Sequence, residues 1–240
     1  MRIMMTLLGN APTAPIDAYL AKANAHVITS LRLAEDGAIA SLIGDTITIE
    51  RTTSALRAVW ILDVPSRTFA IELARNAPGD DGTLEIRESY TPADFGAPEE
   101  PTPPPPPTKP GNLRYVAFIR TDHVAENGAP PDPKTLARMD EYCAPLAASG
   151  TMLGGEGLKS SARGARIRRS AAQRFVLDGP FTESKELVGG YMLVQAHSLD
   201  DVLELIRPWL VIHKEGARVD QSHIEVRRLL DDDRSLVVGA

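Results

Sequence analysis

The sequence has few of the features that mark secreted, membrane or nucleic-acid-binding proteins. Its one cysteine, Cys143, cannot form a disulfide within the chain and has no second thiol with which to bind a metal. The net charge of −6 and the pI of about 5.4 leave no surplus of lysine and arginine for nucleic acid or anionic lipid. No apolar run approaches the roughly 18 residues that a membrane-spanning helix needs. These absences predict a cytoplasmic protein with no nucleic-acid partner and no membrane partner.

Motifs for common cofactors and nucleophiles are also missing. The Gly154–Gly157 segment lacks the lysine and the following serine or threonine of a P-loop. A tight connection between a helix and a strand explains its glycines, although turn geometry does not require Glu156. The histidines lack the spacing of a zinc site, and no Gly-x-Ser-x-Gly or Cys-His pattern indicates a covalent nucleophile. We therefore expect no cofactor and no bound metal.

Proline is abundant in one place, residues 101–110, where it fixes φ and removes backbone donors. Such a segment joins neither a helix nor the interior of a sheet, so it is predicted to be a semi-rigid spacer. At 240 residues, the chain is long enough for two domains of about 100 residues. We expect an α+β unit at 1–95, a linker at 96–112, a second α+β unit at 113–230 and an acidic tail at 231–240.

The same order of elements is predicted on both sides of the linker, and the architecture rests on this repetition. In each half a first strand is followed by a helix, a middle region of strand character, another strand, a second helix and a last strand. This β-α-β-β-α-β order is that of the ferredoxin-like fold, an antiparallel sheet covered by helices on one face. The matching strands are 1–7 and 113–119, 59–66 and 191–198, and 84–87 and 224–227.

Capping and spacing signals place the helices. In the first half, apolar residues at helical spacing predict a helix from Pro15 to Gly37. In the second half, Asp132 is suited to the N-cap and Gly150 to the C-terminal end. The second helix of each half is expected to begin at Ser66 and at Ser198, and Pro208 is expected to end the latter. The matching middle strands are expected at 45–50 and 174–177.

A sheet covered on one face leaves its other face in need of a partner. We expect the uncovered face of the second sheet to carry Tyr115, Ala117, Ile119, Met192 and Val194. The two halves would then pack sheet to sheet as an intrachain pseudo-dimer of the dimeric α+β barrel type. In the alternative arrangement, each half pairs with its twin in a second chain.

Two linked motifs in the second half support a family resemblance. The first runs from Gly154 to Ser161 and continues at 164–168, and the second is Asp178-Gly179-Pro180-Phe181-Thr182-Glu183-Ser184-Lys185-Glu186. Together they resemble the signature of the DGPF branch of the YCII-related proteins, over about 113–230. The resemblance implies a ferredoxin-like α+β unit that usually dimerises, and it implies little about the reaction. The first half, which lacks the DGPF run, is interpreted as a divergent YCII-like copy.

The charged residues around the DGPF run are candidates for a site. Asp178, Glu183 and Lys185 lie beside an expected core strand, where carboxylates that are buried or paired change their pKa. The alternative is structural, because Asp-Gly-Pro is also good turn chemistry. Arg168 belongs to a basic cluster at 163–174, which suits either a solvated strand face or an anion.

His26 is a candidate proton carrier in the first half. It lies eleven residues before Gly37, similar to the spacing of a histidine that simpler YCII proteins pair with an aspartate in a proposed acid/base site. The expected partner region, 74–78, contains no carboxylate, and a histidine beside an apolar stripe can equally be a boundary residue.

Two functions remain open from the sequence. In the first, a cleft between the sheets binds a small organic molecule, and Asp178, Glu156 or His26 moves protons. In the second, the protein is a non-catalytic association or regulatory module, because the first half keeps the apolar skeleton without the motif. The second function predicts that folding and partner binding survive Asp178→Asn and His26→Ala.

Overall fold

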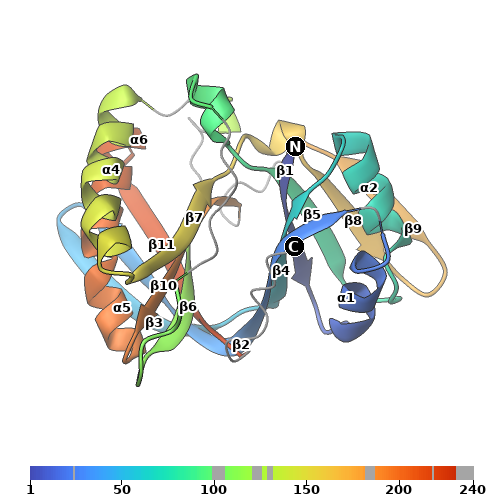
Figure 1. The fold of residues 1–240 in the computed structure, drawn as a ribbon, viewed down its shortest axis with the longest axis horizontal. Helices are drawn as coiled ribbons and strands as arrows, with labels where there is room; N and C mark the ends of the chain where they lie inside the picture. Colours follow the sequence, from blue (N-terminus) through green and yellow to red (C-terminus); the bar gives the residue numbers. More distant parts are fainter. Residues whose placement is uncertain are drawn as a thin grey trace.

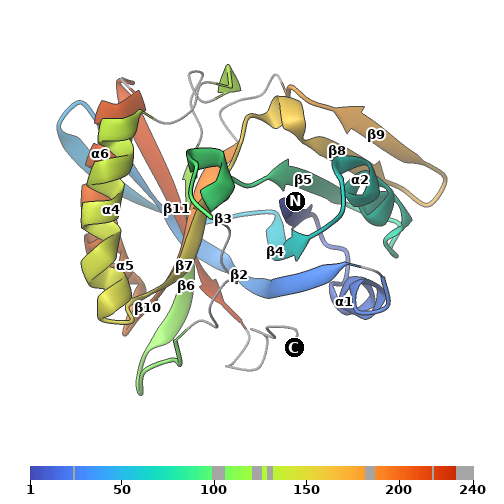
Figure 2. The ribbon, with the colours of Figure 1, turned by 45° about the horizontal axis from the view of Figure 1, so that its top comes forward.

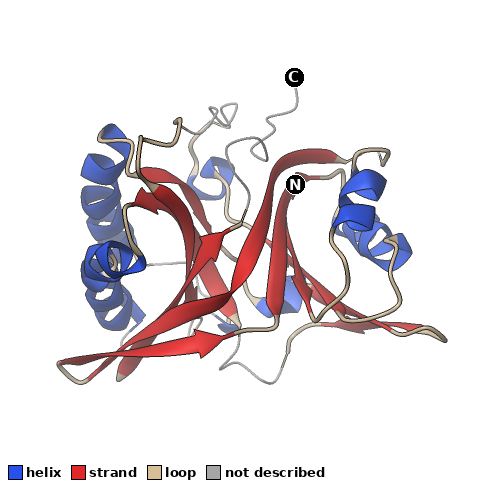
Figure 3. Cartoon of the chain, turned by 90° about the horizontal axis from the view of Figure 1, so that it is seen from below, coloured by secondary structure: helices blue, strands red, loops and turns tan. Residues whose placement is uncertain are grey.

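The structure, a computed structural model, describes residues 1–23, 25–98, 106–120, 126–128, 132–181, 187–217 and 219–230. The described strands form one antiparallel sheet, and the helices lie on its two opposite outer sides (Figures 1 and 3). In chain order the elements are β1 (Arg2–Leu8), α1 (Ala14–Leu20), β2 (His26–Ile43), β3 (Thr46–Thr53), β4 (Leu56–Asp63), α2 (Arg67–Asn76), β5 (Thr83–Glu88), the 3-10 turn η1 (Pro92–Phe95), β6 (Leu113–Arg120), α4 (Pro133–Ala148), β7 (Met152–Gly157), the 3-10 turn η2 (Ser161–Arg163), β8 (Ala165–Arg169), β9 (Arg174–Asp178), β10 (Val188–Ala196), α5 (Leu199–Leu205), α6 (Arg207–Ala217) and β11 (Gln221–Leu229).

The strand order contains two runs with the same internal arrangement. Four strands before the linker lie in the order β2-β4-β1-β5, and four strands after it lie in the order β7-β10-β6-β11. Of the other strands, β3 pairs with β2, and β8 and β9 continue the sheet beyond β5. In each run, the strand that comes first in the sequence lies between the third strand and the last strand of that run: β1 lies between β4 and β5, and β6 lies between β10 and β11. This is the strand order of a ferredoxin-like sheet. The chain is therefore an α+β protein whose sheet is consistent with that fold.

The two runs are joined at two seams. At one seam, β11 pairs with the second half of β2, and at the other, β5 pairs with β8. Only residues 158–164 separate β7 from β8, and Leu158 forms a bridge with Ser89 next to β5. The strand order thus begins at β7 and ends at β8 and β9, which follow β7 in the chain. The sheet curves round an interior that is lined by both runs of strands (Figure 3).

Three apolar clusters fill the molecule. One lies under α1 and α2, and a second lies under α5 and α6. The third is lined by strand residues from both runs, including Met4, Ile61, Phe118 and Leu193. Successive side chains of a strand point to opposite faces, so central strands such as β4 and β6 contribute alternately to a helix-covered core and to the shared interior.

The expected faces of the second sheet are wrong by one residue. Tyr115, Ala117, Ile119, Met192 and Val194 all belong to the core under the helices. Their strand neighbours, such as Val116, Phe118 and Tyr191, line the shared interior instead. Both alternating sets are apolar, because both faces of these strands are buried, so the pattern alone could not assign a face.

The long first helix is also wrong. Helix α1 ends at Leu20, and residues 26–43 form the strand β2. Val27 and Leu31 are four residues apart, but a register shift between Val27 and Thr29 places them on opposite faces of the strand, and both faces are apolar, so helical spacing did not identify the structure. Leu31 and Leu33, two residues apart and both buried in the shared interior, show the strand period.

The other helix ends agree better with expectation. Asp132 precedes α4, which contains Pro145, and Gly150 follows with a positive φ of 68°. The Ser66 and Ser198 side chains accept hydrogen bonds from Phe69 N and Asp201 N, as N-caps do. Pro208 does not end the helix there, since α5 ends at Leu205 and Pro208 lies in the first turn of α6. The expected middle strands are present as β3 and β9.

Candidate functional site

A chain of charged side chains crosses from one run of strands to the other at one end of the shared interior. Arg2 Nε donates to Asp63 Oδ1 at 2.8 Å, and Arg2 Nη1 donates to Glu156 Oε1 at 2.5 Å. His26 Nδ1 lies 4.0 Å from Asp63 Oδ2, and Tyr191 is the partner of Glu156 across β7 and β10. We call these five residues the Arg2 cluster.

Strand register explains how the cluster assembles. Residues directly opposite in an antiparallel pair project from the same face. Arg2 lies opposite Asp63 in the β1–β4 pair, and His26 lies opposite Asp63 in the β2–β4 pair. Arg2 is two residues from Met4 and so shares its face, which lines the interior. The β7 strand brings Glu156 to the same end from the far side of the linker.

The electrostatics of the cluster favour an ionised arginine between two carboxylates. Burial lowers the pKa of Arg2, but Asp63 and Glu156 outweigh burial, and the net pKa is raised. Burial raises the pKa of Tyr191 well above its usual value, and the charge of Glu156 adds to this effect, so the phenol stays neutral. One arginine faces two carboxylates, so a proton on His26 would balance the cluster.

The cluster runs from buried to accessible groups. The side chains of Arg2 and Glu156 are each 16% exposed, whereas His26 is 53% exposed. Glu156 Oε2 is buried and has no hydrogen-bond partner among the described residues. Ser89 Oγ, also buried without such a partner, belongs to the residue whose backbone N donates to Arg2 O at 3.0 Å. An unsatisfied buried oxygen is costly, so these atoms have capacity for a further polar group.

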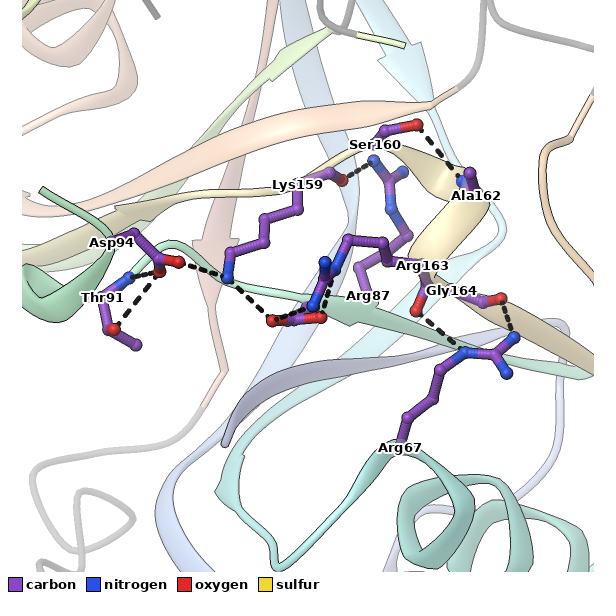
Figure 4. Close-up of polar contacts among 10 residues, drawn as sticks. Arg67, Arg87, Thr91, Asp94, Lys159, Ser160, Ala162, Arg163 and Gly164 are labelled. Atoms are coloured by element: carbon purple, nitrogen blue, oxygen red, sulfur yellow. Dashed lines mark hydrogen bonds and ion pairs between the residues drawn. The ribbon is translucent and has the colours of Figure 1, made fainter. Parts of the chain in front are cut away.

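A second set of ion pairs, the Glu88 cluster, joins the end of β5 to the segment between β7 and β8 (Figure 4). Glu88 accepts hydrogen bonds from Arg163 Nε at 2.6 Å and from Lys159 Nζ at 2.8 Å, and Lys159 also donates to Asp94 at 2.6 Å. Burial opposes ionisation of Glu88, but the bonds from Arg163 and Lys159 outweigh burial and lower its pKa. Each charge here has a partner, so this cluster is best explained as a structural joint.

Buried arginines complete both seams in similar ways. Arg87 donates to the backbone oxygen of Lys159 at 2.8 Å, and Arg227 donates to that of Ala34. Each has a glutamate two residues earlier in its strand, Glu85 and Glu225 respectively. Burial lowers the pKa of both arginines, and the neighbouring carboxylates oppose that shift.

The expected site residues do not converge on one place. His26 begins strand β2 instead of lying in a helix, and Glu156 lies within strand β7 instead of in a turn. These two meet through Arg2 and Asp63. Asp178 ends β9, is 68% exposed and pairs with Arg67 at 2.5 Å, away from the Arg2 cluster. Arg168 is exposed on β8. The expected ligand contacts Glu183 and Lys185 lie outside the described residues.

The basic cluster at 163–174 also differs from a solvated strand face. Arg163 and Arg166 pair with Glu88 and Glu85 respectively. Arg169 is buried and donates to the backbone oxygens of Pro78 and Asp81. These arginines therefore attach the β8–β9 hairpin to the first run of strands.

Sequence reasoning missed Arg2, Asp63 and Tyr191. The carboxylate near His26 was sought in 74–78, but Asp63 supplies it at the end of strand β4. Two signals were available, since Asp63 is a charge at the end of an apolar run and Arg2 is a charge inside another. Linking them to His26 requires the strand register, which the sequence does not give.

The described hollows lie elsewhere on the surface. One of about 440 Å³ lies between α4 and α6, and another of about 490 Å³ lies beside β3 and the start of α5. Among the residues that the structure describes, no three His, Cys, Asp or Glu side chains are placed to hold a metal ion. Within the same residues, no helix combines the length and apolarity needed to cross a membrane.

Comparison with known proteins identifies one domain. Residues 113–209 match the YCII-related domain. The chain is also 44% identical over 43 residues to an uncharacterised protein of Rhizobium meliloti (strain 1021). That similarity covers 18% of this chain and 35% of the relative, so the chain spans about a third of the relative's length. The part of the chain after the linker is thus similar to the YCII-related domain.

Proposed function

We propose that a protein with a YCII-related domain at 113–209 also contains a second, divergent copy of that unit before the linker. The two matching strand orders support this, as do the Glu-x-Arg pairs at Glu85–Arg87 and Glu225–Arg227. The apolar cluster shared by both runs supports an intrachain pseudo-dimer. The DGPF run that ends β9 supports membership of the DGPF branch for the second copy.

We further propose that the Arg2 cluster binds a small organic molecule and exchanges a proton with it. One observation carries this proposal: His26, Asp63, Arg2 and Glu156 form a continuous chain of charges that leads from an accessible imidazole to the buried Glu156 carboxylate beside Tyr191. Buried polar atoms without a hydrogen bond also occur on the structural arginines Arg87 and Arg169, so the chain of charges, more than the unused Oε2 of Glu156, marks this cluster as a candidate site.

Each residue has a chemical role in this proposal. His26 is accessible and its imidazole can both accept and donate a proton, so it takes a proton from the ligand or gives one back. Asp63 faces the imidazole and stabilises its protonated form, and Arg2 holds Asp63 and Glu156 in place. Glu156 Oε2 accepts a hydrogen bond from a hydroxyl or amide group of the ligand. That Asp178, Arg168, Glu183 and Lys185 contribute to a site stays a prediction, separate from the Arg2 cluster.

Ligand-observed NMR in D2O tests both parts of this proposal in one sample. The full chain is mixed with a panel of small organic acids, lactones and β-dicarbonyl compounds. Saturation transfer reports binding, and loss of a carbon-bound proton signal reports exchange with solvent. We expect at least one compound to bind, Glu156→Gln to weaken its binding about tenfold, and His26→Ala to abolish exchange while retaining binding.

His197→Ala is the matched control, because this exposed histidine contacts the backbone of Gly111 and is not part of the Arg2 cluster. The control variant should bind and exchange as the wild type does. The proposal is wrong if the whole panel fails to bind, or if His197→Ala and His26→Ala reduce exchange equally.

A further inference from the structure

The β9 strand is an exposed edge of the sheet with an apolar surface. Within the described residues it pairs with β8 alone, and Figure 2 shows it at the outer limit of the sheet. Phe175, Val176 and Leu177 are three consecutive apolar residues, and their exposed fractions are 55%, 37% and 42%. Soluble proteins usually protect such edges with lysine, proline or a bulge, because an open edge can pair with another strand. Residues 174–178 have none of these.

The backbone groups of β9 that point away from β8 can be assigned from two hydrogen bonds. Ser170 N donates to Gln173 O at 2.9 Å, and Gly179 N donates to Gly164 O at 3.2 Å. Hydrogen-bonded pairs alternate with other pairs along an antiparallel ladder, so residues 173, 175, 177 and 179 bond toward β8. Arg174, Val176 and Asp178 therefore direct their backbone N–H and C=O groups outward.

One symmetric pairing with a second copy of β9 uses the outward backbone groups of all three residues. A twofold axis at Val176 places each Val176 opposite its mate and uses the outward N–H and C=O groups of all three residues. The same register places Arg174 of one copy opposite Asp178 of the other, twice. Opposite charges directly across a strand pair are favourable.

Other symmetric registers are less favourable in charge or in the number of hydrogen-bonded pairs. An axis at Arg174 places two arginines opposite each other, and an axis at Asp178 places two aspartates opposite each other, which is destabilising. An axis at Phe175 or Leu177 also uses outward backbone groups, but it forms two hydrogen-bonded residue pairs within β9 instead of three and places no opposite charges across the strands. The sequence Arg-Phe-Val-Leu-Asp therefore pairs opposite charges in one register only.

We propose that two copies of this protein associate edge to edge through antiparallel pairing of their β9 strands. The interface is small, with five residues from each copy in the strand pair. Interfaces of this size are at the weak end of the known range, so the dimer forms with a dissociation constant of roughly micromolar order. The proposal gives Asp178, at the start of the DGPF run, a role in association that does not depend on the Arg2 cluster.

Sedimentation velocity of the full chain over a range of concentrations tests this association. We expect the sedimenting mass to rise with concentration from 25.9 kDa toward twice that value. Val176→Lys should raise the dissociation constant at least tenfold, because two ammonium groups would meet at the twofold axis. Ile49→Lys is the matched control, since Ile49 is a 43% exposed apolar residue on another edge strand, β3, and it should leave the dimer unchanged.

A charge exchange tests the register. Arg174→Asp and Asp178→Arg each place like charges opposite each other, so each variant alone should dissociate. A mixture of the two variants restores both opposite-charge contacts and should form a heterodimer. Arg174 also donates to the backbone oxygen of Ala77, and Asp178 pairs with Arg67, so thermal melting must show that each variant is folded.

Val176→Lys leaves both of those contacts intact and decides the question alone if a charge variant unfolds. The proposal is overturned if the wild type remains at 25.9 kDa up to concentrations of about 100 µM, well above a micromolar dissociation constant. A dimer that Val176→Lys leaves unchanged also overturns it.

Discussion

The Arg2 cluster and the matching end of the second run use the same strand positions differently. Arg2 lies opposite Asp63 in the first run, and Arg114 lies opposite Gln195 in the second. Asp63 faces the accessible His26, whereas Gln195 is buried and its side chain bonds to the backbone at Lys109, Pro107 and Gly150. One end pairs Arg2 with a carboxylate near the surface, and the other pairs Arg114 with a neutral amide that anchors the linker.

The difference shows how one position can serve either chemistry or connection. A carboxylate beside a histidine can assist proton transfer, but a neutral amide both donates and accepts, so it can hold a passing chain from two sides.

The largest expected effect is a loss of stability when Arg2 is replaced. Arg2→Met leaves Asp63 and Glu156 without their shared cation, so we expect a loss of about 2–4 kcal/mol in the free energy of unfolding. Urea denaturation followed by circular dichroism measures it. A loss below about 0.5 kcal/mol, the usual value for a surface position, would show that the ion pairs do not hold the two runs together.

At the end that carries Gln195, we expect a smaller loss of stability and a local opening of the linker. Gln195→Leu removes the acceptor of Lys109 N and the donor to Gly150 O, which should cost about 1–3 kcal/mol. Hydrogen exchange at the Lys109 amide should accelerate at least tenfold, because that amide loses its partner. Unchanged exchange at Lys109 would mean that Gln195 does not anchor the linker.

The contribution of the Glu88 cluster to stability is expected to depend on pH. The pKa of Glu88 is lowered from 4.5, so its contribution to stability is fully present above pH 4.5 and is lost as the pH falls through the lower, folded-state pKa. Glu88→Gln should lower stability by about 1–2 kcal/mol at neutral pH. The gap between wild type and variant should close in acid, and a gap that widens as the pH falls would contradict the assigned sign.

The smallest effect on stability is expected at His26. Its side chain is 53% exposed and its contact with Asp63 is 4.0 Å, which is long for a hydrogen bond. His26→Ala should therefore change the free energy of unfolding by less than about 0.5 kcal/mol. Thermal melting checks this, and a large drop would mean that His26 is a structural residue.

The sequence predicted local elements better than distant pairings. Ser66, Ser198, Asp132 and Gly150 mark helix ends through backbone geometry and hydrogen bonds within a few residues, and the structure agrees at each of them. The error at α1 arose where the alternation of a strand coincided with helical spacing. Local physics decides caps, but it does not decide whether a region of mixed spacing finds a sheet partner.

The candidate site was predicted in part for a related reason. His26 and Glu156 were identified as titratable residues without a clear local role. Their connection depends on Arg2 and Asp63, which come together through strand pairing between residues 61 positions apart in the chain. A single sequence contains no record of that register, so the intermediate residues could not be found.

A double-mutant cycle between Arg2 and Glu156 tests the central claim, that residues from both sides of the linker form one charged site. The free energies of unfolding of the wild type, Arg2→Met, Glu156→Gln and the double variant give the coupling energy directly. We predict a coupling above about 1 kcal/mol, as for side chains in direct contact. Additive losses, with a coupling near zero, would contradict the account.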